Sequence, residues 1–397
     1  MDDPKERLSK TVSDAELERR WKAVREIMRE KKIDYLVMQN QEEYMGGNLR
    51  WFSDFTARHQ FPMTIIFPVD DEMTLINCGA QPSAPQTFPP PWFARGIKNR
   101  LGDVYFLTMP YTNTYDAKLA VDVLKEKRNP TIGWVERAFI PVTFAEHLLE
   151  NLPGATWVDA TEWVDELRTV KSKEEIELIK GTAALQDACV EFLKKTIKPG
   201  MRDYEVYAEA HYFLSKNGSE RGLVQVGSGP LGTIVPFDIV RFGNRIIREG
   251  DQVSVLIEVN GPGGYYTEMM RQFAVGAVPP QSLLDAWAVA VEAQDRMAEM
   301  LRPGTEPKAI WDMYVEFITK AGYAPPVRSI AHGQGYSLVE RPNIRPDETM
   351  KLKEGMNIVL HPSAVRQGVW TIVGGNYVIR KDGAENLNKS PREIIAI

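Results

Sequence analysis

The chain has 397 residues, of which 43% are hydrophobic and 26% are charged, and its formal net charge is −6. This length is sufficient for two or three domains, and the composition is typical of a soluble globular protein. The negative charge and the lack of a long basic run argue against nucleic acid or an anionic membrane surface as the main partner.

The sequence carries no sign of a membrane span or a signal peptide. Its first residues are polar, and no apolar stretch reaches the roughly 18 to 20 residues that a membrane-spanning helix needs. The two cysteines, Cys78 and Cys189, lie outside any C-x-x-C motif, which is typical of a reducing compartment. We therefore expect a cytoplasmic protein with no membrane partner.

Helical and strand patterns alternate in the first 160 residues. Period-3.6 and period-2 hydrophobic patterns distinguish the two, and two apolar runs around Asp70-Asp71-Glu72 indicate a hairpin. The predicted elements are a helix over 14–31, strands over 33–38, 63–68, 73–77 and 131–135, and a helix over 143–151. This alternation predicts one α/β domain.

The second half shows a repeated pattern. Ser172, with Glu175 three residues later, forms a capping-box signal at the start of a helical stretch that Lys198-Pro199-Gly200 interrupts, and Asp203 is expected to cap the next helix. Arg302-Pro303-Gly304 likewise separates helices predicted over 281–301 and 306–321. Strand-rich sequence follows each helix pair, which indicates an internal duplication.

Several short segments of the second half occur in a characteristic order: Gly250-Asp251, Gly264-Tyr265 through Arg271, His332-Gly333 and Gly355-Met356. With Asn48 to Phe55 in the first half, they resemble the creatinase/prolidase superfamily (M24, aminopeptidase P-like). The resemblance implies a creatinase-type N-terminal α/β domain over residues 1–162, followed by a pita-bread α+β catalytic domain, pseudo-duplicated, over 163–397.

The metal ligands of that superfamily are mostly replaced here. Its peptidases hold two ions with Asp, Asp, His, Glu and Glu. The resemblance places Glu268 at the second Asp position, His332 at the His position, His361 at the first Glu position and Gly374 at the last. The first Asp position falls one or two residues before Glu258, whose register is therefore open. Gly374 has no side chain with which to bridge two ions.

Two interpretations of the remaining set follow. Glu258, Glu268, His332 and His361 could hold one ion, since mixed imidazole and carboxylate sites bind zinc or iron. We favour instead a metal-free catalytic site, as the resemblance to creatinase implies, with no cofactor. Carboxylates crowded together without a cation have raised pKa values, and adjacent imidazoles then supply an acid and a base near neutral pH.

Further residues are expected to contact substrate. Arg271 could pair with a substrate carboxylate, although a salt link to Glu268 is favoured. Asp238, Arg241 or His361 could replace a catalytic histidine that the superfamily carries before Gly-Asp, and Glu340 matches the superfamily pattern. Tyr265 and Trp51 could form an aromatic wall. In a creatinase-like homodimer, Arg58 and His59 would lie near the partner's active site.

The leading functional hypothesis is a creatinase-like hydrolase that cleaves a C–N bond in a small non-peptide molecule without metal. The alternative is a lyase that performs elimination or retro-aldol cleavage, for which the aromatic content suggests an aromatic substrate. A metallopeptidase and a catalytically inactive binding module rank below both.

Overall fold

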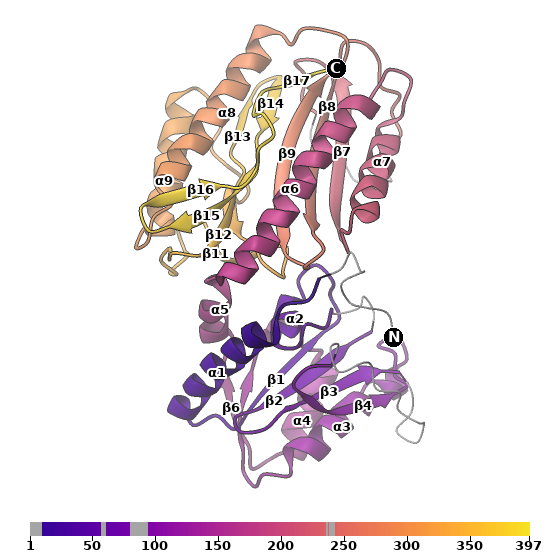
Figure 1. The fold of residues 1–397 in the computed structure, drawn as a ribbon, viewed down its shortest axis with the longest axis vertical. Helices are drawn as coiled ribbons and strands as arrows, with labels where there is room; N and C mark the ends of the chain where they lie inside the picture. Colours follow the sequence, from indigo (N-terminus) through magenta and orange to yellow (C-terminus); the bar gives the residue numbers. More distant parts are fainter. Residues whose placement is uncertain (1–9, 57–60, 80–93, 236, 238–242) are drawn as a thin grey trace. The chain divides into compact units, whose positions relative to one another are not determined.

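The computed structural model describes residues 10–56, 61–79, 94–235, 237 and 243–397. The chain forms two compact units, one spanning Thr11–Arg168 and the other Thr169–Ile397 together with Lys10 (Figure 1). Within the described residues, no helix is both long and apolar enough to cross a bilayer.

The first unit is built on a six-stranded sheet in the order β4-β3-β2-β1-β5-β6. Neighbours β1, β2 and β3 are antiparallel, whereas β3–β4, β1–β5 and β5–β6 are parallel. The strands are β1 (Tyr35–Asn40), β2 (Met63–Pro68), β3 (Met73–Cys78), β4 (Ile97–Asp103), β5 (Thr131–Trp134) and β6 (Thr156–Asp159). The α-helices are α1 (Asp14–Lys31), α2 (Gly47–Ser53), α3 (Tyr115–Leu124), α4 (Val142–Asn151) and α5 (Thr161–Thr169). The predicted hairpin is confirmed as β2 and β3.

Helices α3 and α4 pack on one face of this sheet. Val37, Ile66 and Ile76 project from its central strands into a buried cluster that includes Ala117 of α3 and Phe144 of α4. Burial of such side chains contributes about 25 cal/mol per Å² of apolar surface, so this cluster stabilises the packing of both helices on the sheet.

Asp116 on α3 is a buried acid whose charge opposes folding. Its carboxylate accepts a hydrogen bond of 2.7 Å from Gln39 Nε2, yet burial raises its pKa from 3.8 to about 6. Because the folded pKa exceeds the unfolded value, the folded state binds the proton more tightly. The stability contributed by this group therefore falls as pH rises from about 4 to about 6, by about 3 kcal/mol at most.

We expect Asp116→Asn to remove this pH dependence. The unfolding free energy of the variant, relative to the unmodified protein, should rise by up to about 3 kcal/mol between pH 4 and pH 7. Urea unfolding at both pH values measures it. A difference that stays constant with pH would contradict the assignment.

The second unit contains two larger sheets and a two-stranded one. One has the order β17-β9-β8-β7, the other the order β11-β10-β12-β15-β16, and β13 pairs with β14. The strands are β7 (Gly222–Pro230), β8 (Asp251–Asn260), β9 (Tyr266–Ala274), β10 (Ala331–Gly333), β11 (Glu340–Asn343), β12 (Asn357–Leu360), β13 (Ser363–Arg366), β14 (Val369–Ile372), β15 (Gly375–Arg380), β16 (Gly383–Asn386) and β17 (Ile395–Ala396). The helices are α6 (Lys173–Thr196), α7 (Asp203–Lys216), α8 (Gln281–Glu299) and α9 (Pro307–Lys320).

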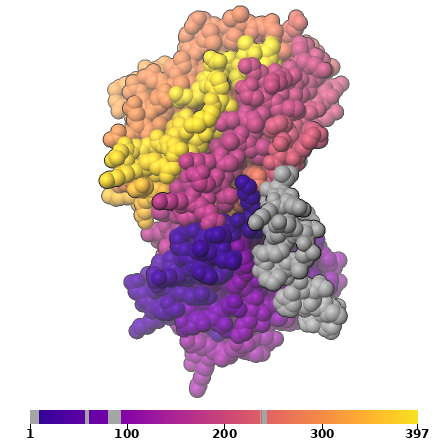
Figure 2. Space-filling model, viewed as in Figure 1, coloured from indigo at the N-terminus to yellow at the C-terminus, as the bar shows by residue number. Residues whose placement is uncertain are grey.

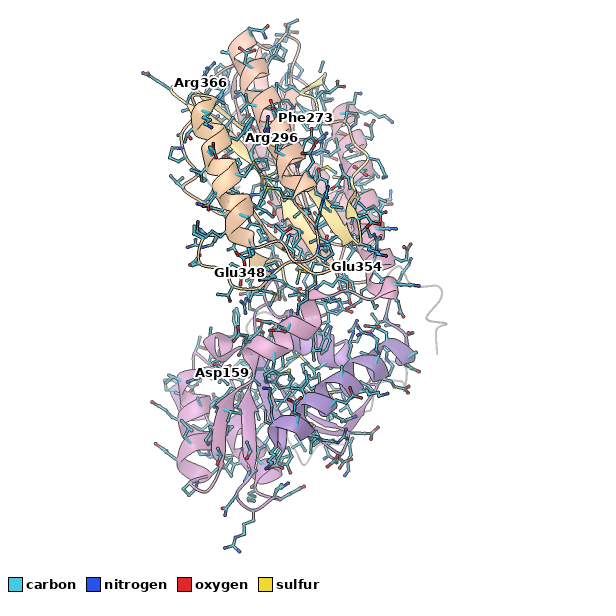
Figure 3. All side chains as sticks on the ribbon, turned by 90° about the vertical axis from the view of Figure 1, so that its left-hand side faces the viewer. Asp159, Phe273, Arg296, Glu348, Glu354 and Arg366 are labelled. Carbon is cyan, nitrogen blue, oxygen red and sulfur yellow. The ribbon has the colours of Figure 1, made fainter. Side chains whose placement is uncertain are left out.

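Each sheet is covered by one helix pair, so the predicted duplication is confirmed. Helices α6 and α7 pack against β7, β8 and β9, and α8 and α9 pack against the strands of the second half. The C-terminal segment, yellow, reaches the surface between α6 and the pair α8 and α9 (Figure 2). Figure 3 faces that pair, where the guanidinium of Arg296 on α8 lies 4.6 Å from the ring centre of Phe317 on α9.

Two helix starts test the predicted caps. Ser172 accepts a hydrogen bond from the backbone N–H of Glu175, whose side chain accepts one in return, so the capping box is confirmed. The prediction for Asp203 is wrong by one residue, because Arg202 is the cap and Asp203 begins the helix. The Asp203 carboxylate instead accepts from the backbone N–H groups of Asn244 and Arg245.

Strand β8 contributes side chains to both faces of its sheet, one packed against helices and the other carrying Glu258. Val253, Val255 and Ile257 pack toward α6 and α7. Because successive side chains of a strand point to opposite faces, Leu256 and Glu258 point the other way. One face of β8 therefore packs into the helix-covered core, and the opposite face carries the candidate residue Glu258.

Candidate active site

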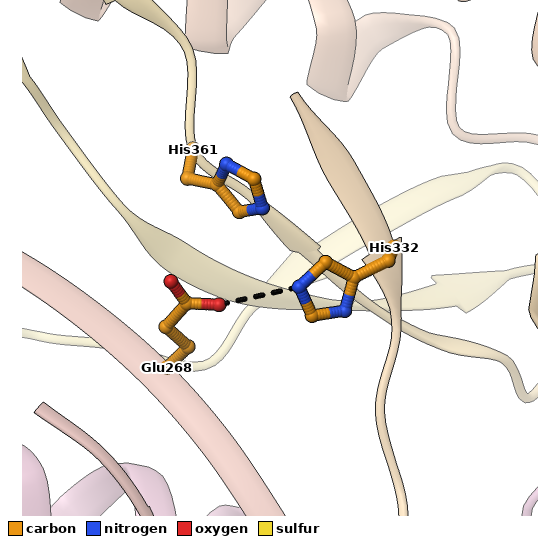
Figure 4. A group of neighbouring side chains, drawn as sticks. All are labelled: Glu268, His332 and His361. Carbon is orange, nitrogen blue, oxygen red and sulfur yellow. Dashed lines mark ion pairs between the residues drawn. The ribbon is translucent and has the colours of Figure 1, made fainter. Parts of the chain in front are cut away.

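Glu268, His332 and His361 form a buried group in the second unit. Glu268 lies on β9, His332 on β10, and His361 directly after β12 (Figure 4). Glu268 Oε2 is 3.4 Å from His332 Nε2, and the two imidazole centres are 5.2 Å apart. One ligand atom from each side chain lies within 4.8 Å of the other two. Three residues spread over more than 90 positions of the chain therefore present three donor atoms to one small volume.

Several polar atoms of this group have no hydrogen-bond partner. These are Glu268 Oε2 and both ring nitrogens of His361, all of them buried. An unsatisfied buried polar atom costs about 1–3 kcal/mol, and native structures contain few. A divalent cation is a partner that two imidazoles and a carboxylate fit well. The donor set therefore fits one metal ion.

The protein backbone orients each member of the group. The N–H of Glu268 donates to Asn376 Oδ1 at 2.7 Å, and the N–H of His361 donates to the carbonyl of Ile330. His332 Nδ1 lies 3.0 Å from the carbonyl of Gly333. An Nδ1–H in that hydrogen bond leaves Nε2 deprotonated and directed at Glu268, which is the tautomer that a metal ligand needs.

The pKa values of the group suit metal binding. The imidazoles of His361 and His332 outweigh the effect of burial and lower the pKa of Glu268 to about 2. Burial lowers the pKa of His361 to about 3. At neutral pH the group therefore offers an ionised carboxylate and a neutral imidazole, the forms in which these side chains bind metals.

Glu258 lies directly opposite Glu268 in the β8–β9 ladder, which resolves its register. Gln334 Nε2 donates to Glu258 Oε1 at 2.8 Å. Burial, and next the charge of Glu268, raise the pKa of Glu258 well above its usual range, and the protonated carboxyl donates a hydrogen bond to Glu268. Two adjacent carboxyl groups thus differ in protonation.

Apolar side chains surround Gly374, where the resemblance places the last ligand of a two-ion site. Gly374 forms an isolated bridge with Met270, and a Cβ added at Gly374 would lie 2.8 Å from Met270 Sδ and 3.0 Å from its backbone nitrogen. Leu256, Met270 and Ile372 form a buried cluster there. Within the described part of the chain, the residues do not fit a two-ion cage.

The prediction of a salt link between Arg271 and Glu268 is wrong. The two residues are three positions apart on one strand, so their side chains point to opposite faces. Arg271 is buried, and its guanidinium donates to the carbonyls of Met270, Gly374 and Ser390. These contacts tie β9 to the C-terminal segment and leave no direct approach for a substrate.

Other residues that were expected to contact substrate pack against or bind other side chains of the protein. Tyr265 stacks on Tyr336 and donates from its hydroxyl to Glu175. Glu340 forms a buried ion pair with Lys171. Trp51 belongs to the first unit, where its ring packs edge-on against Phe52 and beneath Arg20. The remaining candidates, Arg58, His59, Asp238 and Arg241, lie outside the described residues.

Three amide side chains that the sequence reasoning did not single out support the acids. Asn376 Nδ2 donates to Gln334 Oε1 and to Asn357 Oδ1, while Asn357 Nδ2 donates to the Gln334 carbonyl. Gln334 donates to the Glu258 carboxyl, and Asn376 accepts from the backbone N–H of Glu268. Gln334 stands two residues after His332 and could have been noticed for that reason, whereas only the fold identifies Asn357 and Asn376.

Comparison with known proteins places both halves of the chain. Residues 20–170 match the creatinase/prolidase N-terminal domain, and residues 177–383 match metallopeptidase family M24. The Xaa-Pro dipeptidase of Pyrococcus furiosus is 28% identical over 278 residues, covering 68% of this chain and 76% of that protein. The hydrolase/peptidase y4tL of Sinorhizobium fredii is 26% identical over 398 residues, covering 96% and 97%.

Solved structures agree on the fold. The Xaa-Pro dipeptidase from Bacillus anthracis superposes with a TM-score of 0.76 at 20% identity, covering 96% of this chain and all of that one. The X-Pro aminopeptidase from Thermotoga maritima gives 0.77 at 20% identity, covering 95% and 99%. The predicted creatinase-type domain followed by a pita-bread domain is confirmed.

The expectation of a metal-independent creatinase-like hydrolase, and with it the lyase alternative, is wrong. Two findings overturn it: the buried three-donor group that fits an ion, and relatives that are Xaa-Pro dipeptidases. The replaced superfamily ligands remove a two-ion cage but leave the donors for one ion. Residues 177–383, which are more than half of the chain, match the family model, so this chain belongs to metallopeptidase family M24.

Proposed function

We propose that this protein is a metal-dependent peptidase that works with one ion and cleaves Xaa-Pro peptides. The observation that carries the proposal is the convergence of three buried donor side chains, Glu268, His332 and His361, whose ligand atoms lie within 4.8 Å of one another. The Xaa-Pro preference is taken from the relatives in Pyrococcus furiosus and Pyrococcus horikoshii, which are Xaa-Pro dipeptidases.

The donor types narrow the choice of ion. Two imidazole nitrogens and one carboxylate are typical of zinc and of non-haem iron sites, and three protein ligands leave positions for water and substrate. A bound ion would polarise the scissile carbonyl and acidify a water molecule. Glu268, His332 and His361 supply the binding atoms, and their burial excludes competing solvent.

Glu258 is the group best placed to handle protons. It holds its proton beside Glu268, and Gln334 fixes the carboxyl by donating to Oε1. A carboxyl group kept protonated by burial can donate to a leaving nitrogen and later accept a proton. In the proposal, Glu258 is therefore the acid that protonates the departing amine.

Hydrolysis of Leu-Pro by the purified protein, before and after dialysis against a chelator, tests this function. We expect turnover that is lost on chelation and restored by added Zn²⁺, Mn²⁺ or Fe²⁺, with little cleavage of Leu-Ala. Turnover that survives complete removal of metal, or no Leu-Pro cleavage with any of the three ions, would overturn the proposal.

A further inference from the structure

A second set of unpartnered polar atoms lies on the same sheet as the candidate active site. Ser254 on β8 and Gln272 on β9 are direct cross-strand partners, and both are buried, with 3% and 2% of their surface exposed. Ser254 Oγ, Gln272 Oε1 and Gln272 Nε2 all lack a hydrogen-bond partner. A buried carboxamide with neither end satisfied is costly, which points to a ligand.

The ladder between β8 and β9 places this pair on the face of the acids. The pairs Glu258–Glu268, Leu256–Met270 and Ser254–Gln272 follow one another at two-residue steps without a register shift. Side chains two apart on a strand share a face, so Ser254 and Gln272 lie about 13 Å along the strands from the acids. Gly227, their neighbour on β7, adds no side chain.

The apolar pair Leu256–Met270 lies between the polar pairs Glu258–Glu268 and Ser254–Gln272. Leu256, Met270 and Ile372 form a buried cluster, against which the half-buried Phe237 and Trp370 pack. Phe237 and Trp370 meet edge to face at 5.3 Å. A molecule that extends from the metal-binding group to Ser254 and Gln272 would therefore place an apolar portion against this cluster.

The side chains of β8 and β9 favour an uncharged polar end for such a molecule. On this face of β8 and β9, the only charged side chains between Gln252 and Ala274 are those of Glu258 and Glu268. An ammonium or carboxylate beside Ser254 and Gln272 would be buried without a counter-ion on either strand. A carboxamide, in contrast, can donate its N–H to Gln272 Oε1 and accept from Gln272 Nε2.

We propose that Ser254 and Gln272 form a subsite for an uncharged carboxamide that is joined to an apolar group lying on Leu256, Met270 and Ile372. The inference rests on the proposed function and extends it, because it adds longer or end-blocked peptides to dipeptides such as Leu-Pro as substrates. The amide bound here is remote from the scissile bond and positions the substrate.

Equilibrium binding of two matched probes tests the subsite. 4-Methylpentanamide carries one carboxamide on an apolar chain, and its methyl ketone analogue, 5-methylhexan-2-one, has similar size and a carbonyl but lacks that N–H donor. Isothermal titration of the metal-loaded protein should show the amide binding about tenfold more tightly or better, since the ketone leaves Gln272 Oε1 buried without a partner. No turnover is needed, so failure of the proposed peptidase activity would be a separate result.

The variant Gln272→Met keeps the length of the side chain and removes both polar atoms. It should bind the two probes equally and unfold at the same or a higher urea concentration, because an unsatisfied group has been removed. Thr267→Val is the matched control: Thr267 Oγ1 is also buried without a partner, but on the opposite face of β9. This variant should keep the preference for the amide.

Three outcomes would overturn the subsite: no preference for the amide in the unmodified protein, a preference that survives Gln272→Met, or marked destabilisation by Gln272→Met. The last would show that a buried water already satisfies these groups in the free protein.

Discussion

Replacing His361 by alanine is expected to abolish metal binding and, with it, Leu-Pro hydrolysis. His361 is one of the three donors that the described residues bring together, so its removal should weaken binding of Zn²⁺ by more than about 100-fold, which exceeds the usual effect of losing a residue that merely orients a ligand. Both ring nitrogens of His361 lack partners in the folded protein. Stability of the metal-free protein should therefore change little, since relief of an unsatisfied group offsets the cavity.

Isothermal titration with Zn²⁺ and urea unfolding of the metal-free protein measure the two effects separately. His211→Ala is a matched control, because His211 lies on α7 beside Tyr207 and away from the ligand set. A His361→Ala protein that binds zinc with unchanged affinity would show that the three donors do not form the site. Equal loss of zinc affinity in His211→Ala would show a global effect.

Replacing Lys171 by methionine is expected to destabilise the second unit by about 3–5 kcal/mol. Lys171 Nζ lies 2.6 Å from Glu340 Oε2, and both side chains are almost fully buried. Removing one partner leaves a buried charge without compensation, which is the costly case for ion pairs. A Cβ at Gly335 would lie 2.5 Å from Glu340 Oε1, so the backbone also encloses the pair.

The same variant distinguishes a structural Glu340 from a substrate-binding one. Urea unfolding should show the loss in Lys171→Met and much of it restored in Lys171→Met/Glu340→Leu, because a well-packed apolar pair can replace a buried ion pair. Lys351→Met serves as the control, since its pair with Glu306 is more than half exposed and is worth about 1 kcal/mol or less. Full stability of Lys171→Met would contradict a structural role for Glu340 and favour a role in substrate binding.

The course of the chain could be predicted where local patterns decide it. The helix at 14–31 and the capping box at Ser172 follow from side-chain periodicity and from hydrogen bonds within one turn. The hairpin at 63–77 follows from two apolar runs around a short acidic turn. These features do not depend on distant residues.

The chemistry of the site could be predicted only in part, because it depends on long-range pairing. His332 and His361 were identified from their position in short motifs, but their convergence on Glu268 requires β9, β10 and β12 to meet. The register of Glu258 is set by the β8–β9 ladder. The replaced ligands therefore indicate from the sequence that a two-ion cage is lost. That the remaining donor atoms lie within 4.8 Å of one another is visible only in the fold.

Arg271 illustrates the same limit. Its motif placed it beside Glu268 in sequence, but the alternation of side chains along β9 turns it to the other face, where it contacts three backbone carbonyls. Asn376 and Asn357, by contrast, carry no sequence signal. The pairing of β12 with β15 brings them together, and both contact Gln334, which donates to Glu258.

The number of metal ions bound per chain tests the central claim most directly. Purified protein would be stripped of metal, reloaded with excess Zn²⁺, freed of unbound ion and examined by native mass spectrometry. One tightly bound ion per chain, absent in His361→Ala, is the predicted result. Two ions per chain would restore the two-ion cage that Gly374 and Met270 exclude, and no bound ion would contradict a metal site at Glu268, His332 and His361.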